Sequence, residues 1–178
     1  MENSKILNRF WVSFLIICLA VFCRLTPHPP NFAPIAGLSL FSGANLSKKQ
    51  AFLIPLLSMF ISDLILGLHS TMLYVYLSFV FIVFIGFSIK KRQNFYSLII
   101  SSFFSSFLFY LITNFGVWVS TEIYPKSING LIQSYVLAIP FFRNTVLSDF
   151  LYTILFFYGY RFALSFFNKF LFIKNRGD

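Results

Sequence analysis

Residues 24–44 read RLTPHPPNFAPIAGLSLFSGA; they follow the first apolar run of the chain and open a second run that is short and rich in small residues. Three prolines fall within residues 27–30. A proline fixes its own φ at about −65° and cannot continue a helix. We therefore expect a stiff, extended connector at the edge of a membrane, which carries Arg24, His28 and Asn31.

The composition indicates a membrane protein. Of the 178 residues, 58% are hydrophobic, only 11% are charged and 27 are phenylalanine. A soluble domain of this length does not have enough interior to bury so much apolar surface. We therefore expect an all-α fold, a polytopic membrane helical bundle, in which residues 1–178 form a single integral membrane domain with the lipid bilayer as its partner.

The apolar runs predict six transmembrane helices. In the second run, small residues such as Gly37 and Gly43 recur at helical spacing, which lets helix backbones approach closely and places this helix inside the bundle. Residues 131–142 are too short to span, so we expect an interfacial or re-entrant segment between helices five and six. The predicted spans are residues 10–23, 32–46, 51–68, 72–89, 95–119 and 144–168.

The net charge of +9 is explained by basic residues that lie between the apolar runs. In a soluble protein this charge would suggest nucleic acid, which is not an expected partner here. With the N-terminus inside, six spans put ten Lys and Arg residues on the inner side and three on the outer side. The outer three are Arg24, Lys126 and Arg143, and Arg161 falls within the sixth span. The positive-inside rule then predicts that both termini are inside.

Polar residues gather near the outer leaflet in this topology. An ionisable side chain in lipid costs at least ~2.5 kcal/mol and usually faces a partner or a wet cavity, so Asp63 and Asp149 are the most informative. They could line an outward-facing polar chamber, or they could pair with Arg24 and Arg143 and only lock helix ends together. The candidate substrate-binding residues are Arg24, His28, Asn31, Asp63, His69, Asn114, Trp118, Tyr124, Asn129, Gln133, Arg143, Asn144 and Asp149.

These candidates have different expected roles. The aspartates, the arginines and His28 would supply charge and hydrogen bonds to a solute. Trp118 and Tyr124 would either stack on the solute or anchor the helices at the membrane interface. The clustering of the whole set is more informative than any one member.

No enzyme motif is present. The sequence has no G-x-S-x-G, H-E-x-x-H or P-loop, and no Ser, His and Asp at a recognisable spacing. No two of the aspartates and histidines have the i,i+3 or i,i+4 spacing of metal ligands on one helix. Cys18 and Cys23 are expected to pack as small apolar residues. We therefore expect no catalytic residues, no metal and no cofactor.

Several specific strings make the chain look like a family of uncharacterised bacterial integral membrane proteins. They are PHPPNFAPIAGLSLFSGA (27–44), PLLSMFISDLILG (55–67), TNFGVW (113–118), YPKSINGL (124–131) and IPFFRNTVLSD (139–149). That family more loosely resembles the S components, the substrate-binding subunits of energy-coupling-factor vitamin transporters. The shared outline is a short second helix, a third helix that ends in S-D-L-x-x-G, six helices in all and both termini inside.

The resemblance implies a multi-pass protein of the bacterial cytoplasmic (inner) membrane that binds a small organic micronutrient near its outer face. It also implies a partner transmembrane subunit with ATPases, although the first span has only Ser13, Cys18 and Ala20 where S components often carry an alanine stripe for that partner. We therefore expect an S-component-like subunit or a small solitary transporter. A membrane scaffold with structural ion pairs and an enzyme acting on lipid or envelope substrates are the alternatives.

Overall fold

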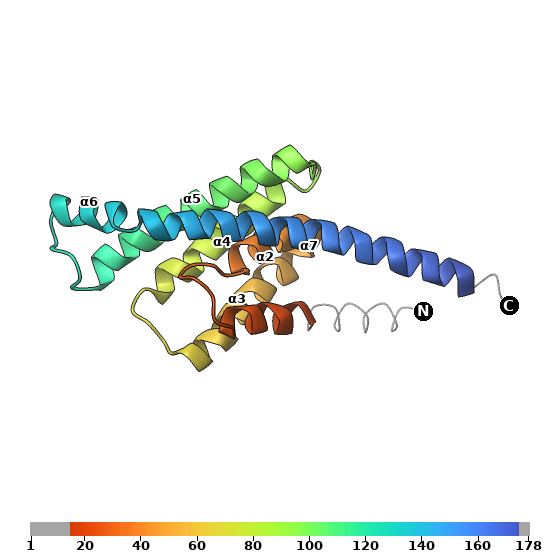
Figure 1. Ribbon diagram of the computed structural model, residues 1–178, viewed down its shortest axis with the longest axis horizontal. Coiled ribbons are helices and arrows are strands. Elements are labelled where there is room, and N and C mark those ends of the chain that lie inside the picture. The colour runs from red at the N-terminus through yellow and green to blue at the C-terminus, as the bar shows by residue number, and fades with distance from the viewer. Residues whose placement is uncertain (1–14, 175–178) are drawn as a thin grey trace.

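The computed structural model describes residues 15–174, which form helices joined by short connections and contain no strand (Figure 1). The expected all-α class is therefore confirmed. The helices are Leu15–Leu25, α2 (Ile35–Asn45), α3 (Lys48–Leu66), α4 (Met72–Ser88), α5 (Phe95–Ser120), α6 (Ile128–Val136) and α7 (Ile139–Lys174).

The described helices overlap the six predicted spans, and α7 begins earlier and ends later than the predicted span 144–168. The start of the first predicted span, residues 10–14, lies outside the described residues. The segment predicted at residues 131–142 is not one element, because α6 ends at Val136 and α7 begins at Ile139. Pro140 therefore lies in the first turn of α7, where its missing N–H leaves no helical hydrogen bond unmade.

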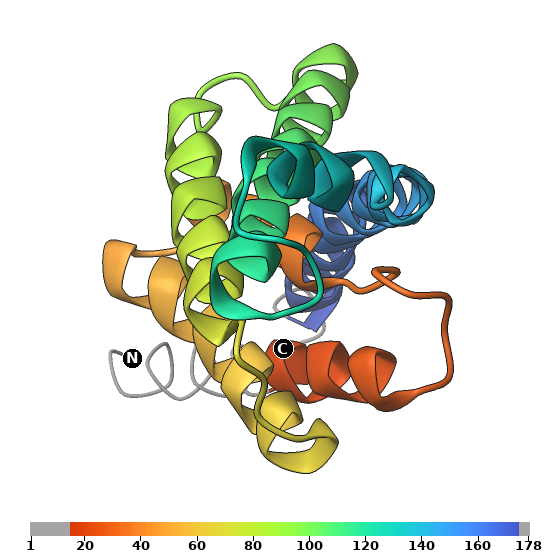
Figure 2. The same cartoon turned by 90° about the vertical axis from the view of Figure 1, so that its left-hand side faces the viewer.

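The short helix α2 lies at the centre of the bundle, packed against α3, α4 and α7 (Figure 2). All residues from Ile35 to Ala44 are buried. A Cβ on Gly43 would overlap the carbonyl oxygen of Val83 and lie 3.0 Å from the Cα of Gly86. The backbones of α2 and α4 are therefore in direct contact, as the small residues of the second apolar run predict.

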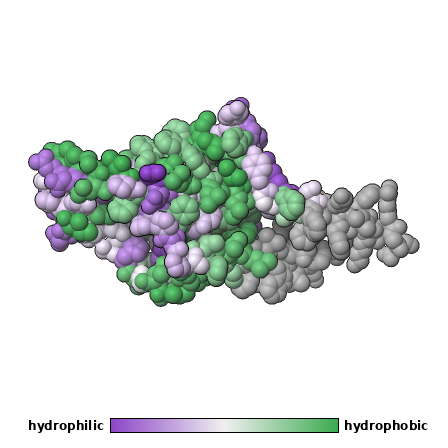
Figure 3. Space-filling view, in the orientation of Figure 1, coloured by the Kyte–Doolittle hydropathy of each residue, from purple (hydrophilic) through white to green (hydrophobic). Residues whose placement is uncertain are grey.

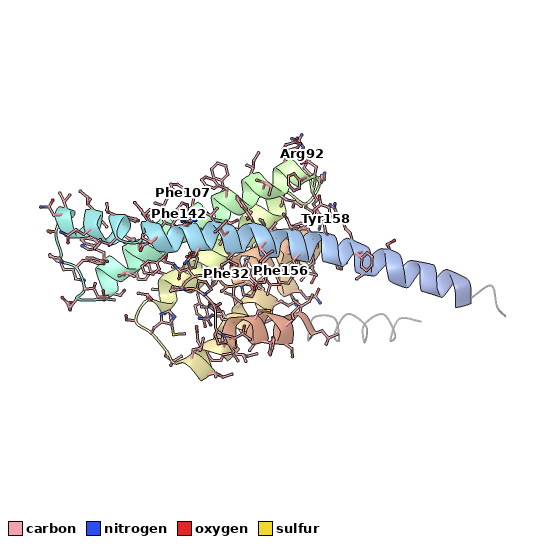
Figure 4. All side chains as sticks on the ribbon, in the orientation of Figure 1. Phe32, Arg92, Phe107, Phe142, Phe156 and Tyr158 are labelled. Carbon is pink, nitrogen blue, oxygen red and sulfur yellow. The ribbon has the colours of Figure 1, made fainter. Side chains whose placement is uncertain are left out.

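Aromatic side chains fill the remaining space between helices. Phe41 of α2 packs against Phe156 and Phe157 of α7, with ring centroids 5.9 Å and 5.4 Å away. Phe107 of α5 and Phe142 of α7 lie side by side with centroids 6.5 Å apart (Figure 4). The long helices α5 and α7 thus form one wall of the bundle, and the C-terminal part of α7 extends beyond it (Figure 1).

The outer faces of the helices are apolar. Many large hydrophobic side chains are exposed, and Figure 3 shows hydrophobic residues over much of the visible side and hydrophilic ones at the end that carries α6. Among residues 15–174, two helices, α3 and α5, are long and apolar enough to cross a membrane, so the six predicted spans are not confirmed.

The Gly43 contact predicts a stability difference between two glycine variants. Gly43→Ala should destabilise the protein by about 1–3 kcal/mol, because the added methyl group meets backbone atoms of α4 that cannot move away. Gly159→Ala is the matched control, since a Cβ at this exposed position of α7 meets nothing within 4 Å and alanine favours a helix by about 1 kcal/mol. Thermal unfolding in detergent measures both. A Gly43→Ala protein as stable as Gly159→Ala would contradict the packing.

Candidate functional site

A cavity of about 760 Å³ lies at one end of the bundle. The connections at residues 26–34, 67–71 and 121–127 meet at this end (Figures 1 and 2). The cavity is lined by the end of the first helix, the connector 26–34, the first turn of α2 and parts of α3, α4, α5 and α7. Its lining is mostly apolar with a few polar side chains, which is typical of sites for small organic molecules.

Arg24 and Asp63 form an ion pair at the side of the cavity. Arg24 Nη1 lies 2.7 Å from Asp63 Oδ1, and their side chains are 14% and 1% exposed. Arg24 also donates to the hydroxyl of Ser62 and to the carbonyl oxygen of Met59 at 3.3 Å. Tyr76 donates to Asp63 Oδ2 at 2.8 Å. Arg24 lines the cavity and Asp63 does not, so the aspartate lies behind the wall and neutralises the arginine there.

Asp149 has a different environment. It is 2% exposed, lines the cavity from α7 and accepts a hydrogen bond from Ser106 of α5 at 2.6 Å. Within residues 15–174 it forms no ion pair, so the structural pairing with Arg143 that the sequence allowed does not occur. Six residues along a helix correspond to about 600° of rotation, and Arg143 therefore lies on a different face of α7, where it is exposed.

The connector that ends the first helix is fixed to α7. Asn144 donates to the carbonyl oxygen of Pro30 at 3.1 Å, and Ser148 donates to that of Ala33 at 2.9 Å. Asn31 has a φ of 61°, the left-handed conformation that asparagine tolerates better than most residues. The connector is therefore attached to α7 over the start of α2.

The loop and helix between α5 and α7 are docked on α5. Lys126 Nζ donates to the carbonyl oxygen of Val119 at 3.1 Å and caps the C-terminal end of α5. Tyr110 donates to the carbonyl oxygen of Tyr135 at 2.7 Å, and Tyr135 donates to that of Leu111 at 2.9 Å. Burial, and then the nearby Tyr110, raise the pKa of the Tyr135 phenol above its ordinary value.

The structure brings about half of the candidate residues together. Those that line the cavity are Arg24, His28, Asn31, His69, Asn114, Tyr124 and Asp149. Those outside the lining are Asp63, Trp118, Asn129, Gln133, Arg143 and Asn144. Several of the second group have structural roles instead, such as Trp118, whose Nε1 donates to the carbonyl oxygen of Pro125 at 3.0 Å.

Sequence reasoning missed four threonines of the lining, Thr26, Thr71, Thr113 and Thr145. Each lies within two residues of a candidate residue, which is the signal that could have found them. It also missed the apolar part of the lining, because apolar residues that face a cavity have the same composition as those that face the core.

No group of three or more His, Cys, Asp or Glu side chains that could hold a metal ion occurs in the part of the chain that the structure describes.

The fold and the cavity together define an all-α protein with apolar helices and a small-molecule-sized cavity at one end. The sequence matches DUF6580, a family of unknown function, over residues 4–170, and the chain belongs to this family. No curated protein and no solved structure matches the sequence.

The Arg24–Asp63 pair predicts a large loss of stability when one partner is neutralised. Asp63→Asn should destabilise the protein by about 3 kcal/mol, because it leaves the Arg24 charge without its counter-ion. Tyr76→Phe is the control, since it removes one hydrogen bond to the same carboxylate and should cost about 1 kcal/mol. Thermal unfolding in detergent compares them. Equal effects of the two variants would show that the ion pair does not stabilise this wall.

Proposed function

We propose that the chain is a solute-binding membrane protein, either an S-component-like transporter subunit or a small solitary transporter. In this proposal the chain crosses the bacterial inner membrane six times, both termini are cytoplasmic, and the cavity opens outward and holds a small organic micronutrient. The observation that carries the proposal is the cavity itself. Its volume of about 760 Å³ is within the range of about 300–1,000 Å³ that ligand pockets occupy.

The dimensions of α7 support a single membrane crossing. At the cavity end, α7 begins at Ile139. At the other end, Arg161 Nη2 donates to the carbonyl oxygen of Gln93, in the connection between α4 and α5, at 2.7 Å. Residues 139–161 of a helix span about 33 Å, close to the roughly 30 Å of a bilayer's hydrocarbon core. The interaction of Arg161 with this connection also suggests that the residue, predicted within the sixth span, lies near the inner interface.

The distribution of charge supports the orientation. The end of the bundle opposite the cavity carries Lys48 and Lys49 at the start of α3, and Lys90, Lys91 and Arg92 after α4. Arg92 points away from the bundle at this end (Figure 4). The positive-inside rule then favours this end as cytoplasmic, which leaves the cavity on the outer side.

The cavity also favours solute binding over the scaffold alternative. A scaffold needs only the Arg24–Asp63 pair and the packing of α2, and it has no use for a cavity with seven polar candidates in its lining.

The surface of the first helix favours the solitary transporter over the coupled subunit. Of the small residues that the sequence offers for a coupling partner, Ala20 is fully buried in the core and Cys18 is exposed. Ser13 lies outside the described residues. A continuous stripe of small residues for close contact with a transmembrane partner is therefore not available on the described face of this helix.

Blocking the cavity should abolish retention of the solute. Val117 of α5 lines the cavity, so Val117→Trp should fill part of it. Val119→Trp is the matched control, because this residue of the same helix is 40% exposed and lies outside the lining. Mass spectrometry of small molecules that co-purify with the protein in lipid nanodiscs should find a compound with the wild type and Val119→Trp, and at least about tenfold less with Val117→Trp. Equal retention by all three proteins would contradict the proposal.

The orientation can be tested with single cysteines in a background where Cys18 and Cys23 are replaced. A membrane-impermeant maleimide added to intact spheroplasts should label Asn129→Cys, in α6 at the cavity end. It should label Lys91→Cys, at the opposite end, only after the membrane is permeabilised. Both positions are exposed, so burial does not account for a difference. Labelling of Lys91→Cys in intact spheroplasts would overturn the proposed topology.

A further inference from the structure

We infer that the solute is an organic cation and that Asp149 is its counter-ion. This inference rests on the proposed function and adds the chemical class of the solute. It follows from the charges around the cavity and from the aromatic residues that line it.

The charges that line the cavity do not cancel. The lining contains two charged residue types, an arginine and an aspartate, at Arg24 and Asp149. Arg24 is neutralised by Asp63 at 2.7 Å, behind the cavity wall. Asp149 is 2% exposed, and Ser106 at 2.6 Å is its hydrogen-bond partner among the described residues. The described chain therefore leaves one buried carboxyl group of the cavity wall without a counter-ion.

The two histidines of the lining do not supply that counter-ion. His28 and His69 are exposed side chains in the connections. Nε2 of His28 lies 3.1 Å from the carbonyl oxygen of Arg24, and Nδ1 of His69 lies 2.9 Å from the hydroxyl of Thr71. Both rings are thus held by their own connections, and neither forms an ion pair with Asp149.

An unpaired carboxylate in such a site is costly, because burial removes the water that solvates its charge. A cationic group of a solute removes this cost when it binds next to Asp149, and an anionic or neutral group does not. The first turn of α2 also lines the cavity and would attract anions. Its partial charge is only about +0.5, which is smaller than the full negative charge that Asp149 carries when a cation binds beside it.

The aromatic residues of the lining favour the same class. Phe79, Phe109, Phe141 and Tyr124 contribute to the cavity wall, and the rings of Phe79 and Phe109 are stacked with centroids 5.5 Å apart. The negative faces of aromatic rings attract quaternary ammonium and other organic cations, with up to about 2 kcal/mol per contact when water is excluded. A carboxylate and several rings around one cavity are therefore complementary to an organic cation.

The test uses two probes of the same shape. One is 4-hydroxyphenyltrimethylammonium, and the other is its neutral isostere 4-tert-butylphenol. Equilibrium dialysis against the full chain in nanodiscs, with empty nanodiscs as the blank for lipid partitioning, gives the two affinities. The fraction bound to Val117→Trp defines binding outside the cavity. The wild type should bind the cation at least about tenfold more tightly than the isostere.

Charge variants then assign this preference to Asp149. Asp149→Asn should bind the two probes equally, and Asp149→Glu should keep a preference for the cation. Glu122→Gln is the control for net charge, because Glu122 is exposed and lies outside the lining, and it should behave like the wild type. The wild-type comparison decides the sign of the preference even if Asp149→Asn does not fold.

The possible outcomes separate this inference from the proposed function. Equal binding of both probes in the cavity of the wild type, or a preference that persists in Asp149→Asn, would overturn the inference and leave a solute-binding cavity in place. Binding of both probes that does not differ between the wild type and Val117→Trp would overturn the inference and also contradict solute binding.

Discussion

The arrangement depends on the burial of one short helix. All residues of α2 from Ile35 to Ala44 are inside the bundle, and its two serines satisfy their hydroxyls on backbone carbonyls, Ser39 on Ile35 and Ser42 on Ala51. The helix has 11 residues, whereas α5 has 26. Eleven residues rise only about 16 Å. The start of α2 therefore does not reach as far toward the cavity end of the bundle as its longer neighbours do. The cavity lies between the first turn of α2 and the ends of the surrounding helices. It exists because α2 is shorter than these helices.

The connector before α2 maintains this space. Its prolines keep the helix from starting earlier, and the hydrogen bonds of its Pro30 and Ala33 carbonyls to α7 keep it from collapsing onto α2. On the other side, Arg24 attaches the end of the first helix to α3 through Asp63. The connector is thus fixed at both of its ends, and it forms a wall of the cavity without filling it.

The sequence predicted the positions of most helices, because most of the apolar runs are bounded by polar, basic or proline-containing residues. It predicted the central position of α2 because only small residues allow contact such as that between Gly43 and Gly86. It located the site less well, since the position of a residue along a span does not define which face it occupies. Gln133 and Arg143 lie at the end of the bundle that holds the cavity, but they are outside its lining. The sequence did not single out the threonines, because a threonine hydroxyl in a helix can donate to a carbonyl oxygen of its own helix. Thr113 donates in this way to the carbonyl oxygen of Phe109.

The same dipeptide, Ser-Asp, occurs at residues 62–63 and 148–149, and its two copies illustrate why chemistry depends on neighbours. Asp63 has an arginine at 2.7 Å and a tyrosine hydroxyl at 2.8 Å. Its charge is therefore neutralised by a partner within the protein. Asp149 has one serine hydroxyl at 2.6 Å and no counter-ion among the described residues. A buried carboxyl group without a partner destabilises the fold. A cationic ligand would supply the counter-ion that Asp149 does not have within the described chain. The difference between the two aspartates is therefore the observation on which the proposal of a cationic solute rests.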